Sequence, residues 1–140
     1  MRFSYIGQPI HGDDIIYRPF IPITFSHNKR SVTFKALVDT GADRTILPLE
    51  TAVLFGFTFD LQRDREEWDG AGGGKFYVYK SPEPVEYSIE QKGFRMLEWK
   101  AHVYFTLKAP TILLGHKGCL DRLDLTFRGK QKMLEIVAAK

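Results

Sequence analysis

The sequence has few of the features that mark secreted or membrane-spanning proteins. Its 140 residues include one cysteine, Cys119, which excludes an intramolecular disulfide framework and fits a reducing compartment. Uncharged apolar runs such as residues 109–115 are far too short to span a bilayer, and residues 1–7 lack the apolar stretch of a signal peptide. We therefore expect a cytoplasmic protein that does not use a membrane as a partner.

An excess of one charge is also missing. Twenty Lys and Arg residues against 17 Asp and Glu residues leave a formal net charge of +3, without a basic tract. A nucleic-acid-binding β domain is therefore the weakest of the functional classes that we consider, and it predicts heparin retention that collapses with salt. Internal repeats and flexible linkers are absent as well, so the chain is expected to form one domain.

The sequence does contain apolar segments with the composition of β-strands. Hydrophobic residues make up 44% of the chain, enough for a real core. Residues 1–17 are predicted to be an irregular N-terminal arm because they contain Gly7, Pro9 and Gly12, and residues 18–140 are predicted to be the folded domain. One short helix is predicted over residues 48–56, and a helical turn over 118–123. Strands are predicted at residues 20–25, 32–38, 76–79, 87–89, 94–107, 112–115, 124–127 and 133–137. The expected fold class is mostly β with one or two short helices.

Asp39-Thr40-Gly41 is the most informative short motif. It follows the apolar segment 34–38, where a carboxylate is partly removed from water and can serve as a general base. The Thr40 hydroxyl can hold a loop in place, and Gly41 permits a close backbone approach. The same three residues are equally typical of an ordinary turn after a strand, so the motif alone leaves both interpretations open.

The surrounding sequence narrows the choice. Residues 37–47 resemble the active-site segment of the retropepsin-like aspartic proteases of clan AA. Residues 70–74 are glycine-rich and lie where that family has its flap, and residues 112–115 resemble its second hydrophobic loop. The resemblance covers about residues 18–137, and it is nearest to small stand-alone bacterial proteins in which Arg18-Pro19 opens the first strand.

The resemblance implies a fold and a mechanism. The fold would be a closed six-stranded-type barrel of a single lobe with a flap. The mechanism needs two carboxylates that share one proton around a water molecule. Because the chain has only one Asp-Thr-Gly and no room for a second lobe, the partner Asp39 would come from a second copy in a homodimer. Asp39, Thr40 and Gly41 would be the catalytic residues, the substrate would be a peptide or protein, and no cofactor is implied. The alternative is a catalytically silent dimerisation or peptide-binding module.

A second group of residues is expected to bind the substrate. The glycine-rich run fails the phosphate-loop pattern, because Asp69 stands where a glycine is needed and Phe76 follows Lys75 where Ser or Thr is needed. A flap that closes over substrate and a loop without a role remain the two interpretations of the glycine-rich run.

Apolar residues near the motifs, such as Ile46, Val78 and Ile112, predict a preference for hydrophobic side chains at the cut. The expected substrate-binding residues are Ala42, Asp43, Gly70, Ala71, Gly72, Gly73, Gly74 and Ile112.

The sequence departs from the family pattern at two positions. Ala42 stands where pepsin-like enzymes usually have Ser or Thr, which predicts a mildly acidic to near-neutral pH optimum. His116 stands where viral relatives have an arginine, so part of the network that ties Asp43 to arginines is missing or replaced, with Arg18 as the expected partner. The four histidines and Cys119 do not have zinc-ligand spacing, so no metal is expected.

Overall fold

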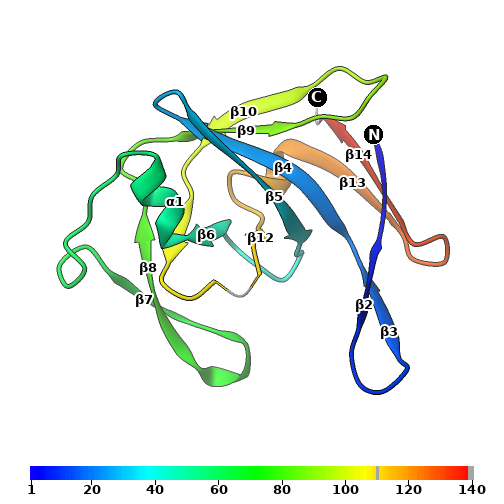
Figure 1. The fold of residues 1–140 in the computed structure, drawn as a ribbon, viewed down its shortest axis with the longest axis horizontal. Helices are drawn as coiled ribbons and strands as arrows, with labels where there is room; N and C mark the ends of the chain where they lie inside the picture. Colours follow the sequence, from blue (N-terminus) through cyan, green and yellow to red (C-terminus); the bar gives the residue numbers. More distant parts are fainter. Residues whose placement is uncertain (110, 139–140) are drawn as a thin grey trace.

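The computed structural model describes residues 1–109 and 111–138, about half of which lie in β-strands (Figure 1). The mostly-β prediction is confirmed, with one short α-helix, α1 (Leu49–Leu54), and two 3-10 turns, at Ala71–Gly73 and Leu120–Arg122. The strands are β1 (Arg2–Ser4), β2 (Ile6–Pro9), β3 (Ile15–Arg18), β4 (Phe20–His27), β5 (Arg30–Val38), β6 (Ile46–Pro48), β7 (Glu66–Asp69), β8 (Lys75–Lys80), β9 (Val85–Ile89), β10 (Leu97–Ala101), β11 (Tyr104–Thr106), β12 (Leu113–Leu114), β13 (Leu123–Arg128) and β14 (Met133–Ala138).

The largest sheet has nine strands in the order β10-β9-β4-β5-β12-β6-β11-β8-β7. Its central strand β12 lies between β5, to which it is parallel, and β6, to which it is antiparallel. Leu114 is in register with Val38, so the end of β5 is enclosed on both sides. The implied barrel is not closed by hydrogen bonds, because β10 and β7 are the two edges of this sheet in the described part of the chain.

The N-terminal segment differs from its prediction. Residues 2–4 form β1, which pairs with β14, and the amino group of Met1 donates to the Ile136 carbonyl at 2.8 Å. Residues 6–18 form the β2–β3 hairpin, a separate two-stranded sheet. The prediction of an irregular arm gave too much weight to Pro9. In a two-stranded sheet every strand is an edge, and an edge position tolerates a residue without an N–H group.

Aromatic side chains fill the core between the strands. Phe25 meets Tyr87 edge-on at a centroid distance of 4.8 Å, and Tyr87 stacks on Trp99 at 5.1 Å.

The predicted helix is confirmed, and the chain reverses after it at Gly56, where φ is 81°. In the described part of the chain, no helix has the length and apolar character needed to cross a membrane.

One predicted strand is in fact two. Residues 94–107 were expected to be continuous, but β10 ends at Ala101 and β11 begins at Tyr104. Strand β10 pairs with β9, whereas β11 pairs with β6 and β8. The break at His102 and Val103 lets the chain change partners, and it brings Tyr104 to the side of the molecule where residue 39 lies.

Candidate active site

The loop after β5 fixes the position of Asp39. The Asp39 N–H donates to the Leu114 carbonyl at 3.1 Å, so β12 holds the start of the loop. The Gly41 N–H donates to Asp39 Oδ1 at 2.9 Å, and the Ala42 N–H donates to the Asp39 carbonyl at 3.1 Å. These bonds orient a half-buried carboxylate, and its second oxygen, Oδ2, has no hydrogen-bond partner among residues 1–109 and 111–138, so it can bind another group.

Residues 114–117 run beside this loop and bind it through the backbone. The N–H groups of His116 and Lys117 donate to the carbonyls of Ala42 and Asp43, both at 2.9 Å. Gly115, the residue before His116, has to be a glycine because a Cβ there would overlap the backbone of Arg44. The Gly115 N–H donates to Thr45 Oγ1 at 3.2 Å, which satisfies this buried group.

The His116 side chain adds a further tie. Its Nε2 lies 2.6 Å from the Thr40 carbonyl oxygen. A carbonyl oxygen only accepts, so Nε2 carries the hydrogen of this bond. Sequence reasoning identified His116 only as a departure from the family pattern, whereas the structure shows its ring bound to the backbone of the Asp-Thr-Gly motif.

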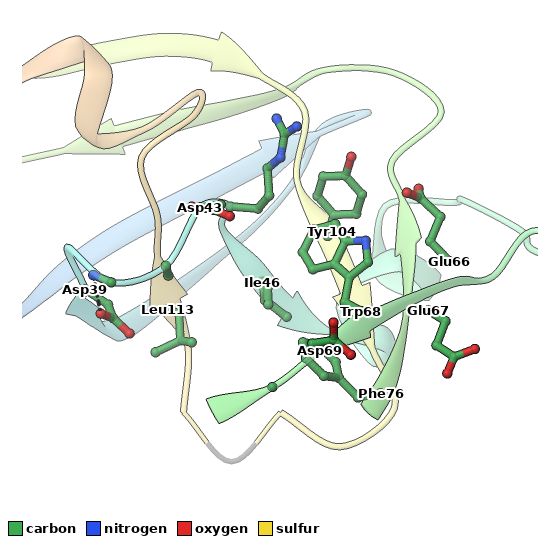
Figure 2. Close-up of a pocket in the computed structure, with 14 residues that line it drawn as sticks. Asp39, Asp43, Ile46, Glu66, Glu67, Trp68, Asp69, Phe76, Tyr104 and Leu113 are labelled. Carbon is green, nitrogen blue, oxygen red and sulfur yellow. Dashed lines mark hydrogen bonds between the residues drawn. The ribbon is translucent and has the colours of Figure 1, made fainter. Parts of the chain in front are cut away.

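A cleft of about 760 Å³ opens in front of Asp39 (Figure 2). Of the predicted site residues, Asp39, Gly41, Ala42, Asp43 and Gly70 line it, and Gly70 belongs to the loop between β7 and β8. The structure does not describe the side chain of Ala71, and the remaining predicted residues lie outside the lining. Thr40 is exposed beside the cleft, Ile112 is buried in the core, and Gly72, Gly73 and Gly74 are exposed near the tip of the β7–β8 hairpin.

The apolar wall of the cleft contains residues that sequence reasoning did not assign to the site. Trp68 packs on Tyr104 with ring centroids 4.5 Å apart, and Phe76 meets Trp68 edge-on at 6.3 Å. Ile46, which was expected near the cut, and Leu113 lie between this cluster and Asp39 in Figure 2. Val78, also expected there, is fully buried under the wall. A sequence signal for Trp68 and Phe76 as lining residues would have been a hairpin across the glycine run, because the β7–β8 pairing places these two residues opposite each other.

The lining of the cleft is acidic. Besides Asp39 it includes Asp43, Glu66, Glu67 and Asp69, with Arg44 as its basic residue. Glu67 lies 3.4 Å from Lys75 Nζ, whereas no ion pair is found for the other three added carboxylates within the described ranges. Burial, together with the charge of Glu66, raises the pKa of the Tyr104 phenol, so this group stays a hydrogen-bond donor.

The tip of the β7–β8 hairpin depends on its glycines. The Gly70 N–H donates to the Gly74 carbonyl at 2.5 Å and closes the turn. Gly72 and Gly73 have φ values of 83° and 84°, which favour glycine over other residues. Both glycines are exposed, so the turn projects into solvent at one end of the cleft.

The one cysteine, Cys119, is buried in the core and does not line the cleft. Burial raises the pKa of the Cys119 thiol to about 12, so it is not a ready nucleophile. In residues 1–109 and 111–138, no group of three His, Cys, Asp or Glu side chains is placed to hold a metal.

Arg18, the expected partner of Asp43, binds a different residue. Its Nη1 donates to Gln8 Oε1 at 3.4 Å.

A solved structure shares this arrangement of strands. It is a retropepsin-like aspartic protease from Rickettsia conorii, with a TM-score of 0.54 and 24% sequence identity over 84% of this chain and 89% of that chain. The fold is that of the retropepsin-like aspartic proteases. Neither a protein-family model nor a curated protein sequence matches the chain. Within the retropepsin-like fold, the Asp-Thr-Gly motif occupies the loop after β5, beside the buried strand β12.

Proposed function

We propose that the protein is an aspartic endopeptidase that acts as a homodimer. The observation that carries this proposal is the orientation of Asp39 at the cleft by the Gly41 N–H, on a loop that β12 and His116 hold in place. The retropepsin-like fold supports it independently. One chain supplies one such carboxylate, so the second comes from another copy related by a twofold axis.

The two Asp39 carboxylates would share one proton, because like charges this close cannot both ionise. The ionised carboxylate takes a proton from the bound water as the water attacks the peptide carbonyl carbon. The protonated one donates a hydrogen bond to the carbonyl oxygen. The resulting tetrahedral species breaks the C–N bond, and the proton passes to the leaving amine. The pair titrates as a unit rather than as two separate residues.

The substrate would lie extended between the Asp39 loop and the β7–β8 hairpin, with the hairpin acting as a flap. An extended peptide can add to strand edges through backbone hydrogen bonds while alternate side chains enter pockets. Ile46, Leu113 and Phe76 line the cleft and favour hydrophobic side chains at the cut. Cleavage sites that cluster at charged residues in a mixed peptide library would contradict this preference.

The test is digestion of a proteome-derived peptide library, read by mass spectrometry from mildly acidic to neutral pH. Wild type is compared with Asp39→Asn and with Asp124→Asn, a matched change at an exposed carboxylate of β13. Cuts should appear with wild type and Asp124→Asn and disappear with Asp39→Asn. The absence of a hydroxyl at residue 42 predicts an optimum in this range, and a rate that peaks below about pH 3 would contradict that.

The silent binding module makes the opposite prediction. It requires that no Asp39-dependent cuts appear at a concentration where the protein is shown to be dimeric. That outcome would overturn the endopeptidase proposal.

A further inference from the structure

The β2–β3 hairpin stands apart from the rest of the molecule. Figure 1 shows it projecting from the body in the same direction as the β7–β8 hairpin, with the loop after β5 between them. It forms its own two-stranded sheet, so neither of its outer edges pairs with another strand in the described part of the chain. An isolated two-stranded hairpin is marginally stable in water, so a projecting hairpin of this kind gains from a partner.

One face of this hairpin is apolar and exposed. The register places Gly7 opposite Tyr17 and Pro9 opposite Ile15, and paired residues share a face. Ile15 is 56% exposed, Tyr17 is 43% exposed, and Ile10 in the turn is 51% exposed. The opposite face carries Ile6, Gln8 and Ile16, which are partly buried. The hairpin therefore turns apolar side chains toward solvent, which is typical of an interaction surface.

Gly7 contributes to the shape of this face. A Cβ at residue 7 would lie 2.9 Å from the Tyr17 ring and 3.1 Å from the Ile15 side chain. The absence of a side chain lets the Tyr17 ring lie across the hairpin beside Ile15. Lys132 Nζ lies 4.5 Å from the centre of the same ring and holds one side of it. The result is an exposed apolar face in which Tyr17 and Ile15 lie side by side, with the Lys132 ammonium against the Tyr17 ring.

The base of the hairpin adjoins the catalytic motif. Pro19 follows β3 directly, and its carbonyl accepts a hydrogen bond from the Val38 N–H at 3.0 Å. Val38 precedes Asp39. A second copy that brings its own Asp39 to the same water must therefore approach within reach of this hairpin. Four extended residues span about 13 Å, so the hairpin can extend well past the Asp39 loop toward that copy.

We propose that the apolar face formed by Gly7, Pro9, Ile15 and Tyr17, together with Ile10, docks on a second copy of this chain and clasps the homodimer. The proposal rests on the dimer of the proposed function. The twofold axis would make each chain give one hairpin and receive one, so a dimer has two identical clasps. Burial of these side chains on both copies would supply apolar area next to the catalytic loops.

The test measures dimerisation rather than cleavage. Sedimentation equilibrium is run on the full chain in the Asp39→Asn background, with and without Ile15→Ser and Tyr17→Ser together. Both side chains are exposed, so the core is unchanged, and circular dichroism checks the fold. The matched control is Phe94→Ser with Met96→Ser, which removes two exposed apolar side chains (54% and 39%) at the β9–β10 turn. We expect the hairpin variant to raise the dimer Kd about tenfold or more, and the control to leave it unchanged.

The outcomes separate the clasp from the enzyme. A hairpin variant that dimerises as tightly as its parent would overturn the clasp and leave the proposed function standing. A parent that stays monomeric at every concentration would overturn the clasp and the dimer together. A hairpin variant that weakens the dimer, in a protein without Asp39-dependent cuts, would support the clasp and overturn the endopeptidase.

Discussion

At the scale of single residues, His116 connects two parts of the site. Its backbone N–H binds the Ala42 carbonyl and its ring binds the Thr40 carbonyl, so one residue fixes both sides of Gly41. Gly41 in turn donates to the Asp39 carboxylate. His116 is thus a positioning residue, which acts on the carboxylate through the loop.

We predict that His116→Leu lowers kcat and leaves KM nearly unchanged, because the ring binds the loop that carries Asp39 and is absent from the cleft lining. A hydrogen bond worth about 1 kcal/mol corresponds to about a fivefold loss in rate. His116→Gln, whose side-chain amide can donate to the Thr40 carbonyl, should recover part of the loss. Steady-state kinetics of both variants check this. Equal kcat values for the leucine and glutamine variants would contradict it.

Gly115 offers a prediction about stability. A Cβ at this position would overlap the Arg44 backbone, so Gly115→Ala must displace the loop that follows Asp39. We expect a loss of about 1–3 kcal/mol in the free energy of unfolding, measured in urea. Gly129→Ala is the matched control, since a Cβ there meets no atom within 4 Å. Equal stability of the two variants would contradict the close packing at residue 115.

The residues of the site differ in how far sequence could predict them. Asp39, Gly41, Ala42 and Asp43 are consecutive or nearly so, and their motif is local. Trp68 and Tyr104 line the same cleft but lie far apart in the chain, and they meet only because β11 joins β8 and β6. No local pattern contains that information.

At the scale of elements, strand β7 brings acidic side chains to the cleft. Glu66 and Asp69 are exposed, line the cleft, and have no ion-pair partner within residues 1–109 and 111–138. They therefore contribute negative potential where substrate would bind. The chain as a whole has a formal net charge of +3, so the sign at the cleft is opposite to that of the whole molecule.

We predict that Glu66→Gln with Asp69→Asn raises KM severalfold for peptides with Lys or Arg beside the cut, and hardly changes KM for neutral peptides. The difference should shrink as salt rises, since screening shortens the reach of a surface charge to about 8 Å near 0.15 M. Glu98→Gln with Asp124→Asn makes the same charge change on β10 and β13, away from the cleft. Equal effects of the two pairs would contradict a local role for β7.

The elements themselves were predictable where the controlling pattern is local. The hairpin β4–β5, the closing pair β13–β14 and helix α1 follow from alternation and from turn residues near them in the chain. The insertion of β12 between β5 and β6 joins residues more than 60 positions apart, and the family resemblance rather than periodicity pointed to it. Strands β1 to β3 were missed because glycine and proline are tolerated at exposed edges.

At the scale of the whole molecule, one chain carries one Asp39 carboxylate, whereas the proposed mechanism requires two. The cleft is open in front of Asp39, and the hairpins β2–β3 and β7–β8 project on the same side (Figure 1). The proposed dimer completes the site from that side. Activity should therefore depend on protein concentration, falling more steeply than in proportion on dilution below the dimer Kd.

The most direct test is a mixing experiment with wild type and Asp39→Asn. Subunits are allowed to exchange at fixed total concentration, and peptide cleavage is measured against the wild-type fraction. If each active site needs an Asp39 from both chains, random pairing at equal amounts leaves about a quarter of the wild-type activity, following the square of the fraction. A linear dependence, with about half of the activity at equal amounts, would contradict a carboxylate pair shared between two copies.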